Sequence, residues 1–364
     1  MRAVVRRGPE LVCDEVADPV PESGQVLVKT LSCGICGSDL HALQHAGRLA
    51  ELARRAGAGS VMDPSRDIVF GHEFCAEIVD HGPGSARSLP PGTRVVSVPF
   101  NLAATGVELV GYSNRFPGGF GEYMVLTEGL LLEVPNGLSA DHAALTEPFS
   151  VGAHAVARGE LDADCAALVV GCGPVGLAVI AALKARGFGP VVAADFSPAR
   201  RRVAEHLGAD ILVDPAAASP HAHWQELGVA TSLGERAMAT AMGEKRATPV
   251  IFECVGVPGL LQSLIEQAPP GSRVVVAGVC MEPDRIEPAL AINKEIDFRF
   301  VFGYSPEEFA ATLRDLAEGR IDPAGVISSQ VGLDGTPAAF EALRDPEAEV
   351  KVMVEPGRRE GDGT

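Results

Sequence analysis

The sequence of 364 residues has few aromatic side chains and a deficit of basic ones. Phe, Trp and Tyr make up 5% of the chain, and 48 Asp and Glu outnumber 30 Lys and Arg, which gives a formal net charge of -18. This charge argues against nucleic acid and anionic membranes as partners, because both repel an acidic surface. We interpret the charge as one that favours solubility.

The cysteines lack the pattern of a disulfide framework. The eight residues form no repeated Cys-x-x-Cys array, and a single such pair occurs, Cys33 with Cys36. A redox disulfide is one interpretation of this pair, but the glycines around it and the Ser-Asp-Leu-His after it fit a metal-binding turn better. The amino-terminal residues lack the long apolar region of a signal peptide. We therefore expect reduced thiols and a cytoplasmic protein.

The sequence also lacks an uninterrupted apolar segment of the membrane-spanning kind. Residues 165–183 carry no charge and are nearly long enough to cross a bilayer. Glycines and a proline interrupt this segment near its centre. We therefore predict a strand, a tight turn and a buried helix there, and no membrane partner.

The length and composition predict two α/β domains. A chain of 364 residues exceeds one ordinary core. Hydrophobic residues make up 46% of it, which is ample for packing, and the 41 glycines and 27 prolines indicate many turns.

One short stretch concentrates metal and proton chemistry. Residues 34–41, Gly-Ile-Cys-Gly-Ser-Asp-Leu-His, place a soft ligand, Cys36, in one turn with the proton carriers Ser38 and His41. Glycines on either side of the cysteine let the backbone bend tightly. Three further candidate ligands follow along the chain: His72, Glu73 and Glu147. Cys, His and Glu are ligands of zinc, and a catalytic zinc keeps one position open for water or substrate.

His72 and Glu73 are neighbours in the sequence, which restricts how they bind one metal ion. In a regular strand their side chains would point to opposite faces. Both reach one ion only where the backbone is irregular, and Gly71 permits such a conformation.

A second stretch has the pattern of a dinucleotide-binding unit. An apolar run at 166–170 precedes Gly171-Cys-Gly-Pro-Val-Gly176, a helix is predicted at 177–186, and a strand at 190–194 ends at an acidic residue. The glycines allow a tight turn, close approach of a pyrophosphate, and close packing of helix on strand. The amino terminus of the helix offers free N–H groups to phosphate. The residues expected at the cofactor are Gly171, Gly173, Pro174, Val175, Gly176, Asp195 and Arg200.

Taken together, these segments resemble the zinc-dependent medium-chain dehydrogenases, on the branch of the sorbitol, butanediol and threonine dehydrogenases. The resemblance spans most of the chain and keeps the order of the family's motifs. The matching segments are 34–41, 71–73, 118–123 (Gly-Gly-Phe-Gly-Glu-Tyr), 146–154 (Thr-Glu-Pro-Phe-Ser-Val-Gly-Ala-His) and 171–176.

The resemblance implies the fold. We expect a GroES-like, β-rich catalytic domain at 1–150, a Rossmann domain with a doubly wound parallel sheet at 151–303, and a return to the catalytic domain at 304–364. Residues 42–66 are longer than the corresponding family segment and predict an inserted helix. That helix lies either near the mouth of the active site or as a surface decoration.

The resemblance also implies the chemistry. We expect hydride transfer between NAD and a small secondary alcohol or polyol, or the matching carbonyl. Zinc would be held by Cys36 and His72, together with Glu73, Glu147 or both. Ser38 would take the proton of the alcohol and pass it towards His41 and solvent, whereas Asp39 is interpreted as a turn residue.

Three further expectations concern selectivity and assembly. A carboxylate at Asp195 accepts hydrogen bonds from ribose hydroxyls and repels a 2′-phosphate, so NAD is expected over NADP, with Arg200 along the adenosine. Relatives with a structural zinc carry four cysteines in a region where this chain has none, between Cys75 and Cys165, so we expect one zinc per chain. The region from Gly92 to Tyr123, called the lobe below, would be stabilised by the packing of its own apolar residues, Val95, Val96, Val98, Phe100 and Leu102.

Phe298, Phe300 and Phe302 alternate on a predicted late strand of the dinucleotide sheet. An exposed edge strand of this kind needs covering. We expect a homodimer or homotetramer.

A non-catalytic dinucleotide-binding protein, such as a redox sensor or a structural protein, is the alternative function. A sensor has no need for the catalytic candidates together: Cys36, Ser38, His41, His72 and Glu147. Their joint presence favours an enzyme.

Overall fold

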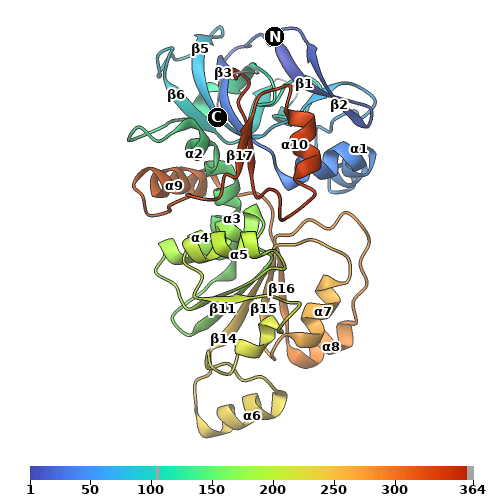
Figure 1. The fold of residues 1–364 in the computed structure, drawn as a ribbon, viewed down its shortest axis with the longest axis vertical. Helices are drawn as coiled ribbons and strands as arrows, with labels where there is room; N and C mark the ends of the chain where they lie inside the picture. The colour runs from blue at the N-terminus through green and yellow to red at the C-terminus, as the bar shows by residue number, and fades with distance from the viewer. Residues whose placement is uncertain (104–105, 359–364) are drawn as a thin grey trace. The chain divides into compact units, whose positions relative to one another are not determined.

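The structure is a computed structural model that describes residues 1–103 and 106–358. The chain forms two compact units (Figure 1). Unit 1 holds Met1–Glu147, Phe309–Gly319 and the segment from Ile327 onward, and unit 2 holds Pro148–Glu308 and Arg320–Val326. The first division therefore falls three residues before the expected limit of 150. Residues 359–364 of the expected last segment lie outside the described residues.

Unit 1 is built mainly of antiparallel strands. Its largest sheet has the order β10-β6-β5-β3-β18-β17, and β9 also pairs with β3. The strands of this sheet are β3 (Gln25–Gly34), β5 (Glu73–His81), β6 (Arg94–Ser97), β9 (Tyr123–Thr127), β10 (Leu131–Glu133), β17 (Ser329–Val331) and β18 (Val352–Val354). A second sheet contains β1 (Arg2–Arg7), β2 (Glu10–Glu15) and β4 (Ile68–Val69), and a hairpin contains β7 (Phe100–Ala103) and β8 (Gly106–Leu109).

Strand β3 is the centre of unit 1, since it pairs with β5, β9 and β18. Val26 and Val28 on this strand are fully buried, and they share one core with Phe70, Phe74 and Phe120. The helices of the unit include α1 (Gly37–Arg55), α2 (Ala140–Ala144) and α10 (Thr336–Ala342), the start of α3 (Thr146–Gly159) and most of α9 (Pro306–Ala317). This packing gives the carboxyl end of β3 a rigid support.

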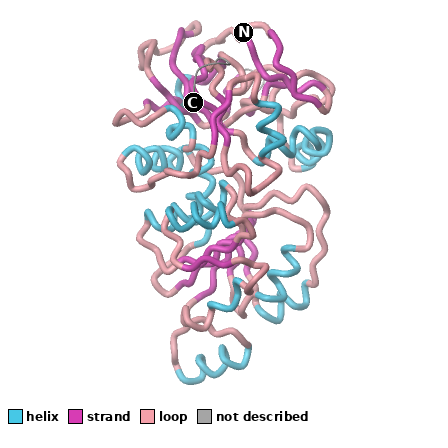
Figure 2. The backbone as a smooth tube through the Cα atoms, in the orientation of Figure 1, coloured by secondary structure: helices cyan, strands magenta, loops and turns pink. Residues whose placement is uncertain are grey.

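Unit 2 contains one parallel sheet with helices around it (Figure 2). Its strand order is β13-β12-β11-β14-β15-β16, which is the order 3-2-1-4-5-6 of doubly wound dinucleotide-binding sheets. The strands are β11 (Cys165–Val170), β12 (Val191–Ala194), β13 (Ile211–Val213), β14 (Thr248–Glu253), β15 (Arg273–Val276) and β16 (Asp297–Phe300). Its helices include most of α3 together with α4 (Pro174–Ala185), α5 (Pro198–His206), α6 (Leu233–Met242), α7 (Leu260–Gln267) and α8 (Pro288–Lys294). The expected fold class is confirmed.

The stretch 34–41 corrects one expectation, because most of it is helix and not a turn. Cys36 has extended backbone angles (φ -91°, ψ 153°) and caps α1, which then runs through Ser38 and His41 to Arg55. The helix is continuous with the predicted insertion, with a kink at His45. The apolar residues Ala42, Leu43, Ala46 and Ala50 are buried along it. Sequence reasoning missed this because glycines and polar residues dominate the first helical turn.

The lobe without cysteines is packed only in part as predicted. Val95, Val96 and Val98 are buried, but Phe100 and Leu102 are 39% and 53% exposed on the β7–β8 hairpin. The prediction for these two residues is wrong, because a two-stranded hairpin has one face without a covering layer. Polar contacts help to hold the lobe instead, including Asn101 Nδ2 donating to Val125 O at 2.7 Å.

Within residues 1–103 and 106–358, each helix is too short or too polar to cross a lipid bilayer.

Candidate active site

Cys36 stands at the junction of β3 and α1. The strand ends at Gly34, and the cysteine is the residue that caps the amino terminus of the helix. Asp39 Oδ2 accepts a hydrogen bond from the Cys36 N–H at 3.0 Å, which fixes the first turn of the helix. The sulfur is therefore carried by a rigid junction and not by a free loop.

An irregular backbone lets His72 and Glu73 face the same place. Gly71 has φ +102°, in the region that L side chains rarely adopt, and β5 begins only at Glu73. A Cβ at Gly71 would come within 2.8 Å of Cys33 Sγ and 2.9 Å of the Gly119 N atom. The Gly119 N–H in turn donates to Gly71 O at 2.8 Å. The two motif segments 71–73 and 118–123 are thus packed directly against each other.

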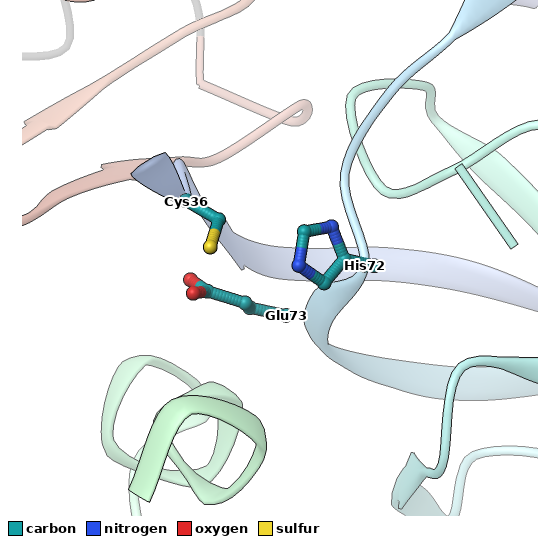
Figure 3. A group of neighbouring side chains, drawn as sticks. All are labelled: Cys36, His72 and Glu73. Carbon is teal, nitrogen blue, oxygen red and sulfur yellow. The ribbon is translucent and has the colours of Figure 1, made fainter. Parts of the chain in front are cut away.

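Three of the four predicted ligands come together in unit 1 (Figure 3). One ligand atom each from Cys36, His72 and Glu73 lies within 4.8 Å of the others. His72 is 7% exposed and Glu73 is 1% exposed, so both are nearly removed from water. Glu147 is buried in the first turn of α3 and does not belong to this group of three.

Asp39 has a second role beyond its local bond. Its side chain is fully buried, and Oδ1 lies 3.4 Å from Nδ1 of His72. Burial alone would lower the pKa of His72, but the charge of Asp39 and hydrogen bonds with Asp39 and Cys36 raise it well above its usual value. With no cation bound, the surroundings of this imidazole favour a positive charge, and a metal ion that binds the neutral ring would release this proton.

Lys351 is a fully buried lysine that pairs with Glu73. Its Nζ contacts Glu73 Oε2 and donates to Ile35 O at 3.0 Å. Burial alone would lower the pKa of Lys351, but the charges of Glu73 and Cys36 and the bond to Glu73 raise it. Gly34 makes room for the pair, since a Cβ there would lie 2.1 Å from Glu73 Oε2.

The donor set fits zinc. Thiolate, imidazole and carboxylate are its usual ligands, and three protein ligands leave a fourth position open. Glu73 Oε1 is buried with no hydrogen-bond partner in the described part of the chain, which is costly for a carboxylate oxygen unless a cation binds it. No other group of three such residues is this compact within residues 1–103 and 106–358.

Ser38 and His41 both lie on α1, shortly after the candidate ligand Cys36 in the sequence. Ser38 Oγ is 2.9 Å from the phenol oxygen of Tyr112. His41 is half-buried, and burial together with the charge of His45 lowers its pKa. A neutral imidazole of this kind can accept a proton.

The glycine loop of unit 2 has the shape that the dinucleotide pattern requires. Gly171 has φ +93°, and a Cβ at Gly176 would lie 1.8 Å from Gly171 O. Gly173 is the N-cap of α4, and Pro174 and Val175 form its first turn. The helix amino terminus therefore stands open beside the end of β11, as a pyrophosphate site demands.

Asp195 and Arg200 lie beside this loop. Asp195 accepts hydrogen bonds from the N–H groups of Cys172 at 2.7 Å and Ser197 at 2.8 Å. Each carboxylate oxygen keeps a lone pair for another donor. A Cβ at Gly173 would lie 3.8 Å from Arg200 Nη1, and Nε of that arginine is buried without a partner in the described structure. Arg201 forms an ion pair with Asp214 and donates to the backbone oxygen of Asp195 at 2.6 Å.

Three residues near the site escaped the sequence analysis. Asp39 was interpreted only as a turn residue. This role explains its hydrogen bond with the Cys36 N–H but not its contact with His72. Lys351 stands alone between Val350 and Val352, and a single charge in an apolar strand is a usable signal of a buried ion pair. Tyr112 has no such signal, because nothing local marks its contact with Ser38.

Two family profiles match the sequence. The alcohol dehydrogenase GroES-like domain matches residues 22–136, and the zinc-binding dehydrogenase domain matches residues 174–318. The chain is 32% identical to (R,R)-butanediol dehydrogenase of Bacillus subtilis (strain 168), over 94% of this chain and 96% of that protein. It is 29% identical to sorbitol dehydrogenase of the same organism, over 93% of each protein.

Solved structures give the same result. The crystal structure of 2R,3R-butanediol dehydrogenase from Bacillus subtilis has a TM-score of 0.78 and 29% identity, covering 98% of this chain and 99% of that chain. A protein from Sinorhizobium meliloti 1021, described as a zinc-binding dehydrogenase and bound to NADP, has the same TM-score at 25% identity. It covers 98% of this chain and 99% of that chain.

Proposed function

Because the chain belongs to the zinc-dependent medium-chain dehydrogenases, we propose that it transfers a hydride between NAD and a small secondary alcohol or polyol, or the matching carbonyl. The observation that supports this proposal most directly is that the ligand atoms of Cys36, His72 and Glu73 lie close together in unit 1. The alternative of a non-catalytic sensor is not favoured, since the relatives are dehydrogenases.

One zinc ion per chain, held by Cys36, His72 and Glu73, is the metal centre of this proposal. Bound zinc supplies Lewis acidity, which lowers the pKa of an alcohol at neutral pH as it does that of water. Glu147 is the second carboxylate, available for exchange with Glu73 or for holding a water molecule. The charge of Glu147 is the last of the causes that raise the pKa of Lys351, the partner of Glu73.

Ser38 is the proposed proton acceptor, and His41 the next carrier towards solvent. The serine lies two residues after Cys36 on the helix that begins at this cysteine. The lowered pKa of His41 keeps its imidazole neutral, so that a lone pair can receive the proton.

NAD is the proposed cofactor, bound at Gly171, Gly173, Pro174, Val175, Gly176, Asp195 and Arg200. We expect a higher kcat/KM with NAD than with NADP, because a 2′-phosphate would meet the carboxylate of Asp195. The Asp195→Asn variant removes that charge, and we expect it to reduce the preference for NAD by about tenfold, the equivalent of ~1.4 kcal/mol. The measurement is kcat/KM with each cofactor. A wild-type preference for NADP would contradict the assignment.

We propose a homodimer or homotetramer, formed through the β16 edge of the unit 2 sheet. Among the described strands β16 pairs only with β15, and Phe300 and Phe302 are 67% and 90% exposed. The expected alternation of three phenylalanines on this strand is wrong, because Phe298 is half-buried against the core of the unit and Phe302 lies beyond the end of β16. Phe300 is the one of the three that is exposed on the edge strand itself. Light scattering should give a mass of at least two chains, and the mass of one chain would overturn the proposal.

The experiment that tests the proposed function is a panel of alcohols with NAD, followed by absorbance of NADH. The relatives suggest 2,3-butanediol and sorbitol as the first substrates, with threitol and simple secondary alcohols beside them. We expect oxidation of at least one diol or polyol that stops when zinc is removed and returns when zinc is restored. Activity that survives removal of zinc would exclude the proposed mechanism.

A further inference from the structure

Tyr112 lies next to the proposed proton acceptor, although 74 residues separate it from Ser38 in the sequence. It belongs to the segment between β8 and β9 and reaches α1 with its phenol group. The phenol oxygen is 2.9 Å from Ser38 Oγ and 2.9 Å from Asp39 Oδ1. One side chain from the lobe therefore contacts two neighbouring residues of the helix that carries the site.

The ring of Tyr112 is fixed by its neighbours. Its centroid lies 5.7 Å from that of Phe70 and 5.3 Å from that of His72, with tilted planes in both cases. Tilted aromatic pairs at such distances are favourable. Phe70 is fully buried, so the ring packs against an immobile part of the core. The hydroxyl is thereby held at one position and cannot follow Ser38 if the serine turns.

The two short contacts impose a direction on the hydrogen bonds. A phenol has one proton to donate, and a carboxylate oxygen can only accept. Hydrogen bonds to a charged acceptor are the stronger ones, so the proton of Tyr112 belongs on Asp39 Oδ1. The remaining contact is then satisfied when the Ser38 hydroxyl donates to the phenol oxygen. This arrangement leaves the lone pairs of Ser38 Oγ directed away from Tyr112.

We propose that Tyr112 is a positioning residue for catalysis: by accepting the hydrogen bond of the Ser38 hydroxyl it holds Ser38 Oγ with its lone pairs towards the proton of the substrate. When Ser38 takes that proton, it releases its own hydroxyl proton to His41, the next carrier of the proposed function. The inference rests on the proposed function, in which Ser38 accepts that proton. Asp39 anchors the arrangement, because its other oxygen is fixed by the N–H of Cys36. Without the phenol oxygen the serine hydroxyl loses this partner and can occupy other staggered positions.

The test is the Tyr112→Phe variant, which keeps the ring and removes the hydroxyl. We expect kcat for alcohol oxidation to fall by about tenfold, less than the roughly hundredfold or more that a general acid–base group itself contributes, because Tyr112 acts only through Ser38. KM for NAD and zinc content should stay unchanged. Tyr123→Phe, on β9, is the matched control and should keep the wild-type kcat.

A double variant separates positioning from a structural role. If Tyr112 acts through Ser38, then Ser38→Ala with Tyr112→Phe should lose no more activity than Ser38→Ala alone, because residues that act as a unit are not additive. Losses that multiply, or a Tyr112→Phe variant with the wild-type kcat, would overturn the inference and leave the proposed function intact. An unchanged kcat in Ser38→Ala would overturn both this inference and the role of Ser38.

Discussion

Replacing Cys36 by Ser or His72 by Ala is expected to lower kcat for alcohol oxidation by about a thousandfold or more, while NADH still binds with nearly its original affinity. The loss follows from the Lewis acidity of the metal, which is worth several kcal/mol of transition-state stabilisation, at ~1.4 kcal/mol for each factor of ten. The cofactor should be retained because the glycine loop belongs to unit 2 and the ligands to unit 1. Single-turnover rates and NADH titrations measure the two effects.

Cys33→Ala is the control for the thiol, because it removes the other half of the Cys-x-x-Cys pair. Burial and the charges of Asp39 and Glu73 raise the pKa of Cys33 well above its usual value, which makes it a poor redox thiol. We therefore expect kcat within about threefold of the wild type, since thiolate chemistry resides at Cys36. Equal losses in the two cysteine variants would support a redox pair and contradict the metal site.

Replacing Lys351 by Met is expected to destabilise unit 1 by about 3–5 kcal/mol, the usual effect of leaving one member of a buried ion pair alone. Glu73 is 1% exposed and would remain in a space with no water to solvate its charge. The measurement is hydrogen exchange of the peptides that cover β3 and β5, in the presence of a chelator so that no metal replaces the lysine. Fluorescence is unsuitable, because the single tryptophan, Trp224, lies in unit 2.

A control variant and a double variant show whether the effect of Lys351→Met comes from the buried ion pair. Arg48→Met breaks an exposed pair with Glu51, and such pairs contribute about 0–1 kcal/mol. Lys351→Met combined with Glu73→Gln removes both charges and should be more stable than Lys351→Met alone. If the single Lys351 variant is as stable as the Arg48 variant, Glu73 and Lys351 do not form a buried charged pair.

The sequence predicted the fold from patterns that act locally. The apolar run, the glycines and the acidic residue of 166–195 are the pattern of one strand–loop–helix–strand unit. The strands of that unit, β11 and β12, are neighbours at the centre of the parallel sheet β13-β12-β11-β14-β15-β16. The candidate ligands were likewise recognised from motifs. These ligands lie close together because Gly71 has a positive φ, and a glycine in a motif can indicate such a conformation.

The remaining contacts of the site depend on pairings that are distant in the sequence. Lys351 follows Glu73 by hundreds of residues and meets it only because β18 and β5 flank the same strand, β3. Tyr112 contacts Ser38 because the fold of the lobe brings the two residues together, and the residue type of Tyr112 does not predict this contact. Local pattern also misled, since the glycines of 34–41 suggested a turn where Cys36 caps a helix, and the apolar Phe100 and Leu102 suggested burial where a hairpin exposes them.

The measurement that tests the metal centre most directly is the titration of zinc-free protein with zinc, with bound zinc and NADH formation followed together on the best alcohol of the panel. The account predicts that both rise in proportion and reach their limit at one zinc per chain, and that Cys36→Ser binds no zinc at that concentration. A limit near two zinc ions per chain, or full activity before any zinc is added, would contradict it.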